Sequence, residues 1–92
     1  MQDDGTLDPR TTGHYTAVQI AVGSYDLFLD GQLVGGIVRN VSITGRPKDW
    51  RAELLDAAAA VRPYPFTADE HVFTGLDAVL AWLGVQGITT LT

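Results

Sequence analysis

The 92-residue chain contains no cysteine, so it can form neither a disulfide bond nor a thiolate metal site. No stretch approaches the ~20 apolar residues that a helix needs to cross a bilayer. The amino terminus also lacks the basic start and apolar run of a secretory signal. From these absences we predict a cytoplasmic protein that does not associate with membranes.

Catalytic motifs are scarce as well. Ser24 and Ser42 are the two serines, and neither has the Gly-x-Ser-x-Gly setting of a hydrolase. The ten glycines form no phosphate-binding loop. Asp69, Glu70 and His71 mix carboxylates with an imidazole, but consecutive strand residues point to opposite faces, which disfavours a metal site. We therefore predict a non-enzymatic protein without a cofactor or metal.

The formal net charge of −5 disfavours non-specific nucleic-acid binding, because phosphates repel an acidic surface. The charge is uneven, since residues 39–51 carry +3 and the rest of the chain −8. The cations of this segment are Arg39, Arg46, Lys48 and Arg51. Beside Trp50 they can contact phosphate while the ring stacks on a base. In the alternative interpretation Trp50 is a core residue and the cations neutralise nearby carboxylates.

The composition changes near residue 14. Residues 1–13 are rich in aspartate, glycine and threonine, with Leu7 as the sizeable apolar side chain after Met1, which predicts a flexible tail. Residues 14–92 are predicted to form a single α+β domain. An apolar fraction of 46% and eight aromatic residues are enough for a packed core.

Two tight turns organise the first part of this domain. The flanking runs alternate between apolar and other residues, with the apolar positions at Val18, Ile20, Val22, Tyr25, Leu27 and Leu29. Gly23-Ser24 suits a type II′ turn, and Asp30-Gly31 is the strongest hairpin signal in the chain. Two-residue turns at both places put these apolar side chains on one core face, with Leu27 opposite Val34.

The third strand is predicted from Gln32 to about Ile43. Gly35-Gly36 indicates a bulge within it, because glycine inside a strand often marks one. An extra residue there moves the core positions from Val34 to Ile37, Val41 and Ile43.

Residues 49–62 give conflicting signals. Their alanines and helix-terminal residues favour a helix, whereas alternation around Trp50 favours a strand. We prefer a strand at about 49–55 followed by an Ala-rich connection, and the helix stays open as an alternative. Residues 62–66 contain two prolines and are expected to be extended.

The last part contains the clearest helix. Leu76, Val79, Leu80 and Leu83 follow the helical period over residues 75–83. Thr74 with Asp77 resembles an N-terminal cap, and Gly84 ends the helix. A short strand is predicted at Glu70–Phe73. An edge strand at Ile88–Leu91 offers a route to a homodimer.

These elements predict an antiparallel β-meander of three to five strands with a C-terminal helix packed on one face. Three segments carry a resemblance: Tyr25–Gly31, Trp50-Arg51-Ala52, and Phe73 with Ala81-Trp82-Leu83. Over residues 15–84 the chain resembles small actinobacterial, plasmid and phage proteins with a helix across a β-sheet. Arm-type DNA-binding domains of phage integrases share that shape. The resemblance implies a fold more than a function.

We therefore expect a bacterial or phage accessory protein that binds another protein through an acidic surface. Tyr64, Phe66 and Trp82 are candidate interface aromatics, since such residues are enriched at binding hot spots. Their alternative role is to cover a sheet edge or the margin of the core. A nucleic-acid-binding domain that uses Arg39, Arg46, Lys48 and Arg51 is the second hypothesis.

Overall fold

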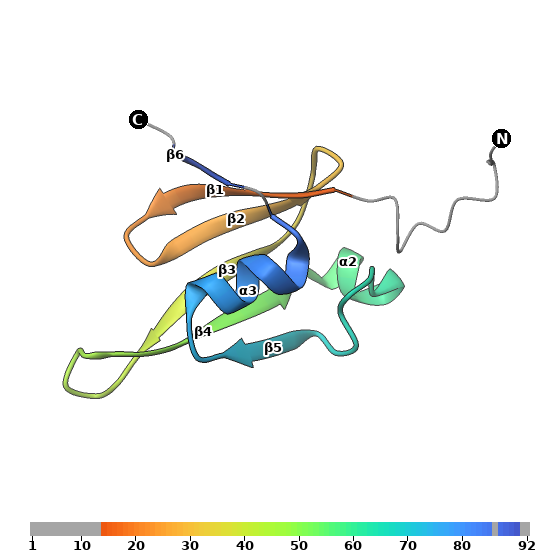
Figure 1. Cartoon of the computed structure of the whole chain (residues 1–92). Coiled ribbons are helices and arrows are strands. Elements are labelled where there is room, and N and C mark those ends of the chain that lie inside the picture. Colours follow the sequence, from red (N-terminus) through yellow and green to blue (C-terminus); the bar gives the residue numbers. More distant parts are fainter. Residues whose placement is uncertain (1–13, 86, 91–92) are drawn as a thin grey trace, which may run out of the picture.

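The computed structural model describes residues 14–85 and 87–90, and the tail predicted at 1–13 lies outside them. The described part of the chain forms a six-stranded sheet with two helices (Figure 1). The elements are β1 (Tyr15–Ala21), β2 (Ser24–Leu29), β3 (Gln32–Val41), β4 (Pro47–Leu54), α2 (Asp56–Val61), β5 (Glu70–Phe73), α3 (Leu76–Leu83) and β6 (Ile88–Thr90). The predicted α+β class is confirmed.

The sheet is larger than predicted and is not a pure meander. Its strand order is β5-β4-β3-β2-β1-β6, and β6 runs parallel to β1. The chain leaves the β5 edge, crosses the sheet in α3 and reaches the opposite edge at β6 (Figure 1). A return across the sheet produces a parallel pair, whereas a tight hairpin produces an antiparallel one.

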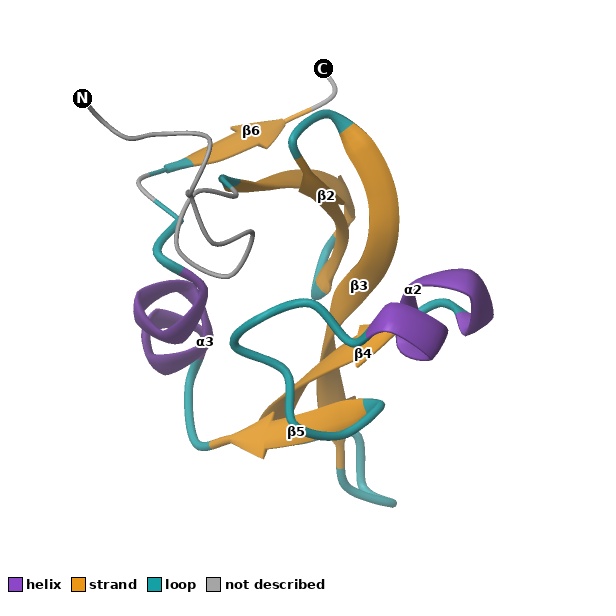
Figure 2. Cartoon of the chain, turned by 90° about the vertical axis from the view of Figure 1, so that its right-hand side faces the viewer, coloured by secondary structure: helices purple, strands orange, loops and turns teal. Residues whose placement is uncertain are grey.

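One face of the sheet is buried by α3. Figure 2 shows α3 on one side of the twisted sheet and α2 on the other. The buried core consists of Tyr15, Ala17, Tyr25, Leu27, Ile37, Ala52, Phe66, Val79 and Leu83. Val79 and Leu83 lie on the predicted apolar side of the helix, so the 3.6-residue period identified the packing face correctly.

The reversal between β1 and β2 comes one residue earlier than predicted. Ala21 pairs with Ser24, so the turn residues are Val22 and Gly23. Gly23 has a φ of 75°, a left-handed conformation that glycine adopts without strain. The register shifts just before Ala21, which leaves Ile20 as the extra residue of a bulge.

This shift exchanges the two faces of β1, so the predicted core set in this strand is wrong. Ile20 is 46% and Val22 81% exposed, and Val18 lies on the face opposite to Ala17. Tyr15 and Ala17 occupy the core instead. Side chains alternate along a strand, so a slip of one residue inverts every position.

The second reversal forms as predicted. Asp30 and Gly31 have φ values of 51° and 86°, and Leu29 pairs with Gln32. Two successive positive φ values define a type I′ turn, whose twist matches that of the flanking strands.

A bulge follows at the predicted place in β3. Leu27 pairs with Gly35 instead of Val34, because the register shifts and leaves Val34 as the extra residue. The bulge moves the core position to Ile37, which is fully buried, as predicted.

Val41 and Ile43 do not continue this core face. Val41 is 53% and Ile43 fully exposed. A second register shift follows Asn40, and Ile43 lies beyond the end of β3 in the turn to β4. The β3–β4 hairpin projects from the rest of the sheet, so nothing in the described chain covers these side chains (Figure 1).

Residues 49–62 contain both of the elements that the sequence left in competition. β4 ends at Leu54, which confirms the preferred strand, and the Ala-rich connection folds as α2. Arg62 ends α2 with a left-handed φ of 47°, so the expectation of extended backbone is wrong at that residue. Its N–H donates to the carbonyl oxygen of Ala58, a bond that satisfies a helix-terminal acceptor.

The ends of α3 are formed by glycine. Gly75 is the N-cap, and no described side chain caps the helix, so the predicted cap by Thr74 and Asp77 is wrong. Gly84 ends the helix with a φ of 74°, as predicted, and its N–H donates to the helix-terminal carbonyls.

Candidate functional site

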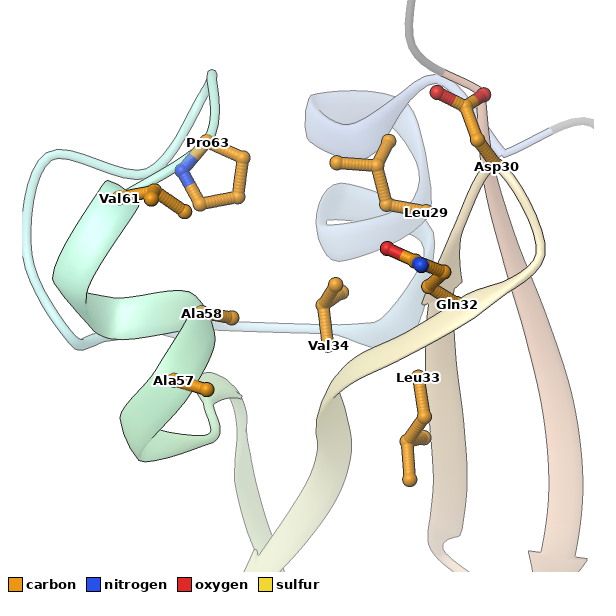
Figure 3. Close-up of a pocket in the computed structure, with 9 residues that line it drawn as sticks. All are labelled: Leu29, Asp30, Gln32, Leu33, Val34, Ala57, Ala58, Val61 and Pro63. Atoms are coloured by element: carbon orange, nitrogen blue, oxygen red, sulfur yellow. The ribbon is translucent and has the colours of Figure 1, made fainter.

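A groove of about 320 Å³ lies between α2 and the β2–β3 hairpin (Figure 3). It is lined by Leu29, Asp30, Gln32, Leu33, Val34, Ala57, Ala58, Val61 and Pro63. Pro63 and Ala58 form one side, while Leu29 and Val34 project from the other (Figure 3). Apolar side chains therefore dominate both walls.

The polar groups of this groove gather at the hairpin end. Asp30 accepts a hydrogen bond from the backbone N–H of His14 at 2.9 Å, and its own N–H donates to the His14 carbonyl oxygen. The carboxylate thus fastens the start of β1, while Gln32 carries the amide nearest the groove (Figure 3). Asp30 is the ionisable side chain among the lining residues, and one of its oxygens is engaged by the His14 N–H, so the groove offers mainly apolar contact.

The four predicted cations do not share one face of the sheet. Arg39 pairs with Trp50 on the same face as the buried Ile37, whereas Arg51 pairs with Val38 on the opposite face. Arg51 Nε donates to Glu53 Oε1 at 3.0 Å, which neutralises part of its charge.

Arg39 packs against the turn between β1 and β2. Its N–H donates to the carbonyl oxygen of Gly23 at 2.8 Å, and a Cβ added at Gly23 would lie 3.2 Å from Arg39 Nε. That Nε is buried and has no hydrogen-bond partner within the described chain.

Arg46 and Lys48 belong to the projecting β3–β4 hairpin. Ser42 donates its backbone N–H to the Arg46 carbonyl oxygen at 2.8 Å, which closes the turn. Lys48 lies at the register shift between Asn40 and Val41 and has no directly paired residue. Both side chains are exposed. Arg39, Arg46 and Lys48 are therefore the cations that can act together, and Arg51 on the opposite face is separate from them.

The three candidate interface aromatics have different environments. Phe66 is 4% exposed and lies in the core, and Trp82 packs edge-on against it with ring centroids 4.9 Å apart. Tyr64 is 56% exposed. Phe66 thus belongs to the core and Trp82 to its margin, and Tyr64 is the most exposed of the three.

His71 belongs to the same aromatic cluster. Its ring centroid is 4.8 Å from that of Trp82 and 5.8 Å from that of Phe66. The N–H of Thr67 donates to His71 Nε2 at 3.1 Å. The imidazole therefore holds the loop before β5 onto α3, and no metal-binding group of three acidic or imidazole side chains occurs within the described residues.

Tyr15 connects this cluster to β1. Its hydroxyl donates to the Tyr64 carbonyl oxygen at 2.8 Å, and its ring lies against Phe66. Burial raises the pKa of the Tyr15 hydroxyl to about 12, and the carboxylate of Asp30 adds to the rise.

The outer face of the sheet carries a row of carboxylates. Asp26 pairs with Gly36, Gly36 with Glu53, and Glu53 with Glu70. All lie opposite the core, because the neighbouring residue in each strand faces α3. Gly36 contributes no side chain, so the row consists of three acids across four strands.

This row ends at a close pair of like charges. The N–H of Leu54 donates to the Asp69 carbonyl oxygen, which makes that pair hydrogen-bonded and the adjacent Glu53–Glu70 pair non-hydrogen-bonded. Side chains approach most closely at non-hydrogen-bonded positions, and like charges there are destabilising. Glu70 is exposed and forms no ion pair with the described basic residues.

Neither the groove nor the acidic row was identified as a site from the sequence. The groove depends on α2, which was expected to be only a connection. The row depends on how β2, β3, β4 and β5 are paired in register, which the sequence does not specify. The one signal in the sequence was the placement of Asp26 on the outer face.

Comparison with protein-family models, curated proteins and solved structures finds no significant match. The similarity to integrase arm domains therefore stays a prediction. None of the described helices is long and apolar enough to cross a membrane.

Proposed function

We propose that this chain is a non-enzymatic interaction module, a bacterial or phage accessory protein that binds another protein through the acidic outer face of its sheet. The observation that carries the proposal is the row Asp26–Glu53–Glu70 on the face opposite α3. Potentials of opposite sign steer partners together and select among them, so a basic partner surface fits this face.

Apolar side chains beside the row support the same function. Val72 is 58% and Leu33 47% exposed on this face. Contacts of this kind exclude water around charged pairs, which strengthens the pairing of a basic partner with the carboxylates.

The proposal is tested by cross-linking and affinity capture of partner proteins, with this chain as the bait, from cells of the organism that produces it. One bait is the triple variant D26N/E53Q/E70Q, and the matched control is D56N/D69N/D77N. Each removes three negative charges and changes the formal net charge from −5 to −2. A partner retained by the wild-type chain and the control, and lost by the outer-face variant, is the expected result.

Two outcomes contradict the proposal. If both triple variants lose the partner equally, net charge and not the outer face controls binding. If the chain retains no protein but binds duplex DNA tightly, the chain is a nucleic-acid-binding domain instead.

A second candidate function is nucleic-acid binding, favoured by the pairing of Arg39 with Trp50 on one face next to the hairpin that carries Arg46 and Lys48. Phosphate contacts by cations beside an aromatic ring are typical of single-strand binding. Fluorescence anisotropy with labelled oligonucleotides tests it. Binding that weakens with salt and is lost in R46E/K48E, but not in R51E, supports this candidate.

A further inference from the structure

We propose that the free edge of β5 binds an extended segment of the partner protein as an additional strand, with a basic residue opposite Glu70 and an apolar residue opposite Val72. The inference rests on the proposed function and specifies the partner's chemistry. It follows from the backbone at this edge and from the charges beside it.

The Leu54 N–H donates to the Asp69 carbonyl oxygen, which makes this pair a hydrogen-bonded pair of the β4–β5 ladder. Hydrogen-bonded pairs alternate in an antiparallel ladder, so His71 and Phe73 also bond to β4. Glu70 and Val72 therefore direct their N–H and C=O groups away from β4. β5 is an edge of the described sheet, so these groups are available to an added strand.

The charges beside this edge indicate which side chains the added strand carries. Glu70 lies directly opposite Glu53, and the nearby Arg51 is engaged with Glu53. A basic side chain opposite Glu70 would relieve the repulsion between the carboxylates. The negative charge of Glu70 also disfavours pairing with a second copy of β5, because that copy would bring further glutamates to the same face.

The side chains of Glu70 and Val72 share the outer face, two residues apart. A partner strand in register places one residue opposite each of them, also two positions apart. The chemistry of this edge thus fits a strand with a basic residue and an apolar residue separated by one position. The basic side chain would pair with Glu70 at the end of the acidic row, and the apolar side chain would pack beside the exposed Val72.

The test titrates the ¹⁵N-labelled full chain with the end-blocked heptapeptide Thr-Lys-Thr-Val-Thr-Lys-Thr, in which lysine and valine are separated by one position and share one face of the strand. The control peptide has glutamate in place of lysine. We expect saturable binding of the lysine peptide, slower hydrogen exchange at the Glu70 and Val72 amides, and cross-strand NOEs from peptide to β5. The glutamate peptide should give no saturable shift.

Two pairs of variants separate the contributions. Val72→Pro and Val72→Ala both remove the valine side chain, but only the proline removes the outward N–H, so binding should be about fivefold weaker in V72P than in V72A. E70Q should weaken binding by a similar factor, whereas D77N on α3 should leave it unchanged. Amide spectra of the free variants establish that each one is folded.

Equal affinity of V72P and V72A, absence of binding, or shifts confined to the outer face near Gly36 and Val38 would overturn the edge inference. Concentration-dependent protection of Val72 without peptide would assign the edge to a second copy and also overturn it. The proposed function is tested separately: a captured partner that V72P retains and D26N/E53Q/E70Q loses leaves that function standing. Capture that is indifferent to the triple variant removes the function itself.

Discussion

Gly35 lies where the backbone of β4 passes close to β3. A Cβ added at this position would overlap the carbonyl oxygen of Glu53 and lie 3.1 Å from Leu54 Cα, and both are backbone atoms of β4. Gly35 is therefore required for close approach of two strands rather than for a turn.

Gly35→Ala should lower the free energy of unfolding by about 2–3 kcal/mol, because the β3–β4 pairing must separate to admit the methyl group. Urea denaturation measures the loss. Gly87→Ala is the control, since an added Cβ there meets nothing within 4 Å, and its effect should stay within about 0.5 kcal/mol. Equal stability of the two variants would contradict the close-approach argument.

Tyr15 gives the chain a dependence on alkaline pH. With the pKa raised from 10.0 to about 12 in the folded protein, the folded state holds its proton more tightly than the unfolded state. The resulting stabilisation is complete below pH 10 and is lost as the pH rises toward 12. Over this range the free energy of unfolding should fall by about 3 kcal/mol on account of Tyr15.

Tyr15→Phe isolates this contribution. At pH 7 the variant should be about 1 kcal/mol less stable, because the Tyr64 carbonyl oxygen loses its donor. Above pH 10 the difference from the wild-type chain should shrink and then reverse. Urea titrations of both proteins at pH 7, 10 and 11.5 measure it, and a constant difference at all three values would contradict the role of Tyr15.

At the scale of elements, α3 and α2 differ in how they are held. α3 buries Val79 and Leu83 in the core, whereas no residue of α2 is buried. Helix stability in proteins comes mostly from packing of an apolar face. We therefore attribute the stability of α3 to its core contacts. We attribute that of α2 to the backbone hydrogen bonds at its two ends, from the Leu55 N–H to the Val34 carbonyl oxygen and from the Arg62 N–H to the Ala58 carbonyl oxygen.

Two matched substitutions test this difference. Val79→Ala and Val61→Ala each replace valine by alanine in a helix, but Val79 is fully buried and Val61 is 76% exposed. V79A should cost about 2–3 kcal/mol, and V61A should be neutral or slightly stabilising through helix propensity. Thermal and urea unfolding measure both, and similar losses would show that α2 is packed as firmly as α3.

The elements that were predicted well depend on nearby residues. The Asp30-Gly31 turn and the α3 period each involve contacts within a few positions along the chain. The β1 register was wrong because it depends on distant contacts, the Tyr15 hydroxyl with Tyr64 and its ring with Phe66. A turn glycine such as Gly23 is compatible with either register, so distant packing decides between them.

At the scale of the whole molecule, the sheet separates most of the charges. The acidic row occupies the outer face together with Arg51, which is paired with Glu53, while Arg39 lies on the α3 side and Arg46 and Lys48 on the projecting hairpin. The sequence predicted that the cations were unevenly distributed along the chain. It could not assign them to faces, because a face depends on strand register.

The two edges of the sheet should also differ from its centre in stability. β6 has three residues, all exposed, whereas Leu27 and Ile37 are fully buried in the central strands. Amide exchange at Thr89 should therefore proceed through local opening, at rates at least a hundredfold above those of Leu27 and Ile37. Hydrogen exchange followed by NMR measures these rates, and equal protection would show that β6 unfolds only with the whole sheet.

The sequence alone determined the α+β class, the first three strands, the Asp30-Gly31 turn, the bulge in β3 and the extent of α3. Each of these follows from patterns within a short stretch of chain. Tertiary structure decided which face of β1 is buried, that β6 pairs in parallel with β1, and that Asp26, Glu53 and Glu70 form one row. The reason is physical: these features depend on contacts between residues far apart in the chain, and a local pattern is compatible with more than one arrangement of them.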